Sequence, residues 1–141
     1  MIEPIKQLQS TLKDRGLSTT YARKQVFIAL LDKEPQTMNQ IVSACPAIDR
    51  TSVYRTINLY ERLGVAKRMQ IGWKYKIELA GNFHSHHHHL TCMHCGSTTP
   101  FEEDPQLLTS LEKIVRENDF EMREHQLEIQ GLCKNCRPRF A

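Results

Sequence analysis

Four of the five cysteines in this 141-residue chain form two Cys-x-x-Cys pairs, Cys92 with Cys95 and Cys133 with Cys136. At this spacing both sulfurs of a pair can bind the same metal ion, and two pairs complete a tetrahedral zinc site. A site closed by four thiolates has no open position for water or substrate, so its role is structural. We therefore expect one structural Zn²⁺ per chain.

A histidine-rich segment at residues 84–89, His-Ser-His-His-His-His, lies just before the first cysteine pair. Imidazole binds zinc, iron, copper or nickel, and a carboxylate partner extends this range to manganese. Because side chains alternate across a strand, His87 and His89 should face one side while His86 and His88 face the other. The segment could serve two metal sites, one metal site and one interface, or neither if it is a solvated loop. Candidate partners are Glu78, Glu102, Glu103, Asp104 and His125.

The two halves of the chain differ in composition. Residues 1–80 carry 13 Lys and Arg against 7 Asp and Glu, whereas residues 81–141 carry 6 against 9 and hold all seven histidines. A basic half and an acidic half crowded with metal ligands predict two domains with different partners. No apolar stretch approaches the ~18 residues of a membrane span, and no export signal precedes the paired cysteines. We expect a cytoplasmic protein without a membrane partner.

The basic half has the element order of a winged helix-turn-helix, three helices and a hairpin, with one further helix before them. Apolar spacing, capping residues and glycines predict a first helix through Ile5, Leu8 and Leu12 that ends at Gly16, and a second from Thr19 or Thr20 to before Pro35. A short helix is expected from Thr37 to near Cys45, and a longer one over Arg50–Leu63, between Asp49 and Gly64. Strands are expected over Val65–Ile71 and Trp73–Leu79.

The helix over Arg50–Leu63 is the expected recognition helix, because the last helix of this trio enters the major groove of DNA. Arg55 can bind a phosphate or a guanine, Tyr54 can contact a thymine methyl or a phosphate, and Ser52 can bind a phosphate. Thr51 shares the exposed part of the same helix. The alternative is an ordinary solvated helix face.

The acidic half predicts a small α/β unit. Strands are expected over His86–Cys92 and Gln126–Leu132, with an amphipathic helix over Pro105–Asn118 between them. This helix carries more apolar residues than so small a unit can bury, so we expect a homodimer, which suits a two-fold DNA site. The expected fold class is α+β: an N-terminal winged helix-turn-helix at residues 1–80, a hinge at 81–84, and a small α/β dimerisation domain with the four-cysteine zinc site at 85–141.

Several segments resemble the ferric uptake regulator family, in the family's order. Asp49–Ile57, which contains Val-Tyr-Arg, resembles the recognition helix, His86–Gly96 resembles the metal-binding core, and Leu17–Arg23 resembles the start of the second helix. With the second cysteine pair, the match spans about residues 10–137. It implies a homodimeric transcriptional repressor of metal homeostasis that binds a pseudo-palindromic operator in double-stranded DNA.

The resemblance also implies roles for individual residues. Tyr54 and Arg55 match the family's DNA-contacting pair, and Arg23, in the matching second-helix segment, is a further expected contact. The four paired cysteines match its structural zinc site. Two more ligand sets are implied. The regulatory set, which spans the hinge, consists of Glu78, His87 and His89. A further set, present in some members of the family, consists of His86, His88 and His125.

Some positions depart from the family's pattern. Pro35 stands where the family has a histidine ligand, and Pro100 stands where an acidic ligand is expected. Leu107 or Leu108 replaces the acid that completes the further set. Both ligand sets are therefore incomplete. We hypothesise that His84, Glu102 or Glu103 completes the regulatory set.

The expected mechanism couples metal binding to DNA binding. A second, regulatory divalent metal bound across the hinge would fix the spacing of two recognition helices, which must reach grooves about 34 Å apart. Histidine and carboxylate ligands suit Fe²⁺, Zn²⁺ or Mn²⁺ and do not select among them. The alternatives are a peroxide- or redox-sensing regulator of the same family, a member that binds DNA without added metal, and a zinc-ribbon adaptor that binds protein. A zinc hydrolase is disfavoured because the four cysteines close their site.

Overall fold

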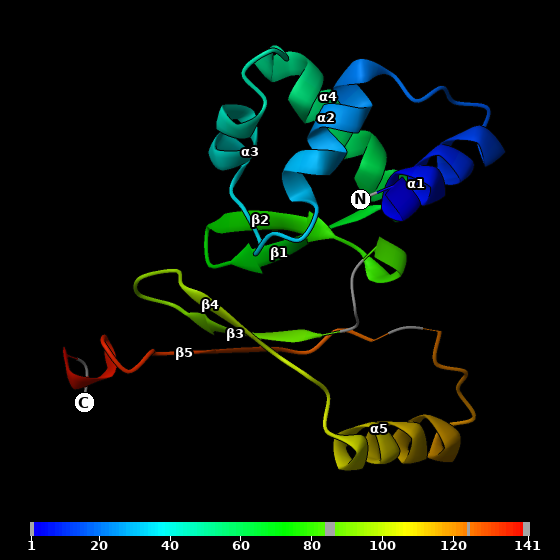
Figure 1. The fold of residues 1–141 in the computed structure, drawn as a ribbon. Helices are drawn as coiled ribbons and strands as arrows, with labels where there is room; N and C mark the ends of the chain where they lie inside the picture. The colour runs from blue at the N-terminus through cyan, green and yellow to red at the C-terminus, as the bar shows by residue number, and fades with distance from the viewer. Residues whose placement is uncertain (1, 84–86, 124, 140–141) are drawn as a thin grey trace. The chain divides into compact units, whose positions relative to one another are not determined.

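The computed structural model describes residues 2–83, 87–123 and 125–139. The chain divides into two compact units, Met1–Ser85 and His86–Ala141 (Figure 1). No helix among the described residues is long and apolar enough to cross a membrane.

The first unit consists of helices followed by a hairpin, as the sequence predicted. Its elements are α1 (Ile2–Asp14), α2 (Tyr21–Leu30), α3 (Met38–Ala44), α4 (Arg50–Leu63), the antiparallel strands β1 (Ala66–Ile71) and β2 (Lys74–Leu79), and a 3-10 helix, η1 (Gly81–Phe83).

Capping residues set the bounds of the helices. The Asp49 side chain accepts a hydrogen bond from the Ser52 N–H and begins α4, while Gly64 ends it with a φ of 73°. The left-handed conformation at this position favours glycine, because it is strained for a residue that carries a Cβ. Thr20 caps α2 through the Arg23 N–H, which decides between the two threonines considered above.

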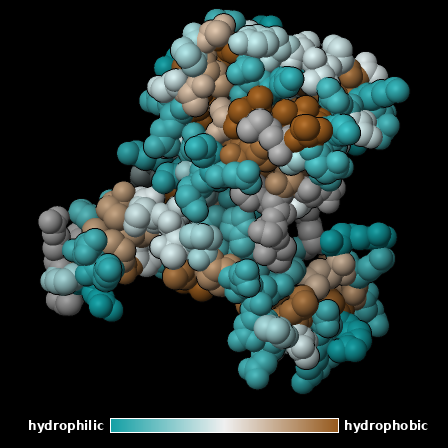
Figure 2. All heavy atoms as spheres, viewed as in Figure 1, coloured by the Kyte–Doolittle hydropathy of each residue, from teal (hydrophilic) through white to brown (hydrophobic). Residues whose placement is uncertain are grey.

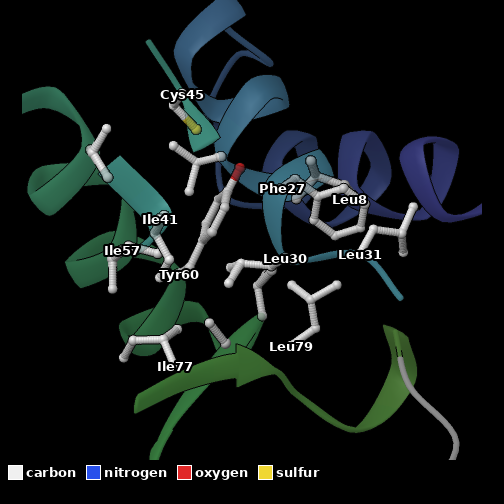
Figure 3. Close-up of a cluster of buried hydrophobic side chains, with 14 of the residues drawn as sticks. Leu8, Phe27, Leu30, Leu31, Ile41, Cys45, Ile57, Tyr60, Ile77 and Leu79 are labelled. Carbon is white, nitrogen blue, oxygen red and sulfur yellow. The ribbon is translucent and has the colours of Figure 1, made fainter. Parts of the chain in front are cut away.

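The core of this unit lies between the helices and the hairpin (Figure 3). Figure 3 shows side chains from every helix and from β2 pointing into one cluster: Leu8, Phe27, Leu30, Ile41, Ile57, Tyr60, Ile77 and Leu79. The buried Tyr60 hydroxyl donates a hydrogen bond to the Arg23 carbonyl, so its polar atom is satisfied. Burial raises the pKa of Tyr60 well above its ordinary value. The apolar stripes predicted from helical spacing are therefore the faces that form the core.

The second unit is a three-stranded sheet with one helix. It contains β3 (His88–Cys92), β4 (Thr98–Phe101), α5 (Pro105–Glu117), β5 (Glu128–Gly131) and a 3-10 helix, η2 (Arg137–Arg139). The strand order is β4-β3-β5, and β3 is antiparallel to β4 and parallel to β5. The sequence did not predict β4, which contains Pro100, and it made β5 longer than observed. A proline fits here because β4 is an edge strand.

Apolar burial is very uneven between the two units. Among the described residues, every buried apolar side chain lies within residues 8–79 except Cys92 and Cys136. The amphipathic α5 has no buried residue at all. The described part of the second unit therefore lacks an apolar core of its own, and Cys92 and Cys136 are its only buried apolar side chains.

Candidate metal centres and nucleic-acid interface

The two Cys-x-x-Cys pairs meet because β3 and β5 are parallel neighbours. The register pairs Cys92 with Gly131, so the segments that follow the two strands start side by side. The Met93 N–H reinforces this by donating to the Gly131 carbonyl at 2.8 Å. As a result, four sulfurs lie within 4.8 Å of one another, those of Cys92, Cys95, Cys133 and Cys136.

The sulfur geometry fits a tetrahedral zinc ion. The Sγ atoms of Cys95 and Cys133 are 3.8 Å apart, and Zn–S bonds of about 2.3 Å give tetrahedral sulfur–sulfur edges of about 3.8 Å. The Cys133 N–H donates to Cys92 Sγ at 3.4 Å. The structure thus fits the predicted four-cysteine zinc site.

The protonation of the four thiols is unequal. Backbone hydrogen bonds, first that from Cys133, lower the pKa of Cys92 to about 6. Burial, together with the neighbouring thiols, raises the pKa of Cys136 to about 12. Clustered thiols cannot all ionise beside one another without a cation, whereas a bound Zn²⁺ keeps all four as thiolates.

The strand β3 and the residue before it present imidazoles on two sides, as alternation predicted. The rings of His87 and His89 lie 4.7 Å apart in an edge-to-face arrangement. Pro100 stands directly opposite His89 in the β3–β4 register. A residue that cannot bind metal thus occupies the place from which an acidic side chain would reach His89.

The other side of β3 contributes to a separate group formed by His88, Glu103 and His125. One ligand atom from each residue lies within 4.8 Å of the others. The Nε2 atom of His88 is 3.0 Å from Glu103 Oε1, and His125 Nε2 hydrogen-bonds the same oxygen. Glu103 was hypothesised for the regulatory set, but here it joins two residues of the further set. Glu102 is exposed and stands outside this group.

Glu78 lies near the end of β2. Its neighbours Ile77 and Leu79 point into the core, so alternation directs Glu78 to the other face of the hairpin. There its carboxylate is 3.3 Å from the Lys67 ammonium, its partner in the β1–β2 register. His84 and His86, two further candidate ligands, lie outside the described residues.

The predicted recognition helix presents its polar side chains to solvent. In α4, Thr51, Arg55 and Asn58 are exposed and Tyr54 is half-buried, while Val53, Ile57 and Tyr60 face the core. The Ser52 hydroxyl is already engaged, because it donates to Asp49 Oδ1 at 2.6 Å. Ser52 therefore contributes first to the cap of the helix and has only its acceptor capacity left for a ligand.

Two neighbours of Tyr54 were not identified as site residues from the sequence. Arg50 donates to the Tyr54 hydroxyl at 3.4 Å and to Asn39 Oδ1 at 3.2 Å. Spacing of four residues on a helix could have indicated the first contact, but nothing in the sequence places Asn39, from α3, beside α4. Arg23, the predicted contact on α2, donates to the Ser18 carbonyl at 2.6 Å.

Comparison with known proteins gives consistent matches. A family model described as the ferric uptake regulator family matches residues 14–130. The ferric uptake regulation protein of Bacillus subtilis is 30% identical over 142 residues, covering 94% of this chain and 93% of that protein. The peroxide-responsive repressor PerR of Staphylococcus aureus (strain Mu50) is 26% identical and covers 92% and 89%.

Solved structures show the same fold. The structure of the ferric uptake regulator Fur of Helicobacter pylori, reported to have three functional metal binding sites, matches with a TM-score of 0.80. It covers 96% of this chain and 92% of that chain at 22% identity. This likeness confirms the expected α+β fold, a helical N-terminal region followed by a small sheet domain.

Proposed function

Because the chain belongs to the ferric uptake regulator family, we propose that it is a transcriptional repressor whose affinity for operator DNA is raised by a divalent metal. The relatives named above are regulators, and this family is not one of enzymes. A repressor acts where its operator lies, which supports a cytoplasmic location. The proposed partner is a pseudo-palindromic site in double-stranded DNA.

One observation carries the metal-responsive part of the proposal: the histidine groups are separate from the four-cysteine group. Cysteine thiolates close the zinc site, so that ion holds the fold and does not exchange readily. Imidazole and carboxylate ligands bind divalent metals less permanently. The His87 and His89 rings, which lie side by side, supply such ligands outside the cysteine cluster.

We assign the regulatory site to Glu78, His87 and His89, with the hinge at residues 81–84 between the carboxylate and the imidazoles. Glu78 supports this assignment because it faces away from the core of its own unit, at the end of β2. A metal that joins a ligand of the winged-helix domain (1–80) to ligands of the second domain (85–141) restricts the hinge. His84 remains our candidate for an additional ligand, since Pro35 and Pro100 cannot bind metal.

The second domain is the proposed dimerisation domain. Its sheet exposes Leu90 and Ile129, which pair in the β3–β5 register, and Leu132 follows them. Together with the cysteine loops, these residues line a pocket of about 520 Å³. Figure 2 shows hydrophobic atoms on the surface around α5, where Ile114 is 54% exposed. A second copy of the chain would cover these surfaces and leave each dimer with two recognition helices.

The first test measures whether metal changes DNA affinity. The wild-type protein would first be treated with a mild chelator that removes loosely bound metal but spares the four-cysteine zinc. It would then select duplexes from a randomised pool in the absence of oxygen, with Fe²⁺, Mn²⁺ or Zn²⁺ added in separate experiments. Fluorescence anisotropy with the selected duplex should show about 5- to 150-fold tighter binding with one metal, the usual range of allosteric coupling. The variant His89→Ala should lose this enhancement and keep its structural zinc.

The matched control is His94→Ala, which removes an exposed histidine of the same domain that belongs to neither histidine group. It should behave like the wild type. Equal affinity with and without every metal would contradict metal sensing and favour the metal-independent alternative. Loss of DNA binding only after peroxide treatment of the iron-loaded protein would favour the peroxide-sensing alternative.

We also propose that Glu103 is the carboxylate of the further site, with His88 and His125, in place of the acid missing at Leu107 or Leu108. Glu103→Gln keeps the shape of the side chain but removes its charge. In a chelator competition titration, this variant should bind the Zn²⁺ or Mn²⁺ ion of the further site at least about tenfold more weakly than the wild type. The neighbouring Glu102→Gln should leave that affinity unchanged. If both variants bind metal like the wild type, the three residues form a hydrogen-bonded structural cluster instead.

A further inference from the structure

The single tryptophan of the chain, Trp73, stands fully exposed at the tip of the β1–β2 hairpin. Tryptophan gains more free energy from burial than most residues, and it is the type most enriched in binding hot spots. The tip that carries it is well defined. Gly72 adopts a φ of 59°, as the first position of a tight two-residue turn requires, and Gln70 Nε2 donates to the Gly72 carbonyl at 2.9 Å. The hairpin thus holds the backbone at Trp73 in a defined turn and presents the indole ring to solvent.

This tip is continuous with the recognition helix. A pocket of about 380 Å³ is lined by Asn39 at the start of α3, Tyr54 of α4, and Trp73 and Lys74 of the hairpin, among other residues. Tyr54 is one of the proposed DNA contacts. A duplex that reaches Tyr54 therefore lies beside the surface that also carries Trp73.

The charges around the pocket favour a polyanion. The cations farther along the hairpin are paired, because Lys67 lies 3.3 Å from Glu78 and Arg68 lies 2.8 Å from Glu61. At the tip, by contrast, Lys74 makes no ion pair with any residue that the structure describes. Its positive charge is available to a ligand, and phosphate is the anion that DNA supplies next to a groove.

We propose that Trp73 and Lys74 form a second DNA contact, in which the indole enters the minor groove beside the half-site read by α4 and the ammonium binds a flanking phosphate. The inference rests on the proposed DNA-binding function and extends it to a residue outside the recognition helix. Apolar side chains placed in a minor groove wedge between base steps, which couples affinity to the deformability of the flanking sequence. Preference for flexible steps there would be a signature of this contact.

The test uses the tryptophan as its own reporter. Because position 73 holds the only indole, titration of the wild-type protein with the selected duplex should change its emission and shield it from acrylamide. Trp73→Ala should weaken binding about 5- to 100-fold, as loss of a stacked aromatic does, while Trp73→Phe keeps most of the affinity. Lys74→Gln should lower the slope of log affinity against log salt by about one per half-site. The charge-matched control Lys33→Gln, an exposed lysine after α2 in the same unit, should change neither quantity.

The outcomes separate this inference from the function on which it rests. If the wild type binds the duplex with unchanged emission, and Trp73→Ala binds equally well, the hairpin contact is wrong and the DNA-binding function stands. If no duplex can be selected by the wild-type protein, both are wrong. Since Trp73 contributes nothing to the core, Trp73→Ala should retain the wild-type melting temperature, and a loss of affinity can then be attributed to the contact.

Discussion

Replacing Cys133 with serine should remove zinc from the chain and unfold the unit His86–Ala141, while the unit Met1–Ser85 stays folded. The reason is the uneven distribution of apolar burial. Nearly all buried apolar side chains of residues 8–79 form one core, whereas the only buried apolar side chains in the described part of the second unit are those of Cys92 and Cys136. Structural zinc contributes about 10–16 kcal/mol of apparent free energy in small domains, as much as the whole stability of a typical fold.

The measurements are metal content and limited proteolysis with mass spectrometry. After the mild chelator, wild-type protein should contain about one zinc ion per chain and resist cleavage, whereas Cys133→Ser should contain none. Its early cleavage sites should fall within residues 86–141. Loss of the folded second unit should also abolish the proposed dimer, which light scattering would detect.

The fifth cysteine supplies the control. Cys45 is buried in the first unit, where its Sγ lies 3.7 Å from the Gln25 carbonyl, and burial raises its pKa. Cys45→Ala should therefore keep the zinc and the wild-type cleavage pattern. A Cys133→Ser variant that lacks zinc but still resists proteolysis would contradict the argument. It would mean that contacts between two copies of the chain, and not the metal, stabilise the second unit.

The helices of the first unit could be predicted because their signals are local. Asp49 and Gly64 bracket α4 in the sequence, and in the structure they cap it as expected. The stripe of Val53, Ile57 and Tyr60 follows from helical spacing and faces the core. The four-cysteine cluster was also predictable, because each pair is held together by a spacing of two residues and the ligand chemistry of zinc joins the pairs.

The parts that could not be predicted depend on contacts between distant segments. The strand β4 has only four residues and contains Pro100, so its own sequence gives no strand signal, and it forms by pairing with β3. Glu103 lies 15 residues from His88 and 22 from His125, so only the folded sheet brings the three together. Comparison with the family's pattern indicated a missing acid at Leu107 or Leu108 without indicating that Glu103 stands beside both histidines.

Arg55→Ala should produce the largest loss of DNA affinity of any single change in the first unit. Arg55 is exposed near the start of α4, the part of a recognition helix that reaches base edges. A bidentate contact between arginine and guanine contributes about 1–3 kcal/mol. The proposed dimer makes this contact in both half-sites, so the expected loss is about 2–6 kcal/mol, or roughly 30- to 20,000-fold in affinity. Anisotropy with the selected duplex at fixed salt would measure it.

Two further variants decide how Arg55 acts. Arg62 lies seven residues along the same helix, near its end, so it shares the direction of Arg55 but is displaced by about 10 Å along the axis. If α4 reads bases through its first turns, Arg62→Ala should change affinity less than about twofold. An equal loss in both alanine variants would show non-specific attraction to phosphate instead. Arg55→Lys keeps the charge but not the bidentate geometry, so it should retain the salt dependence and lose discrimination at one base pair in each half-site.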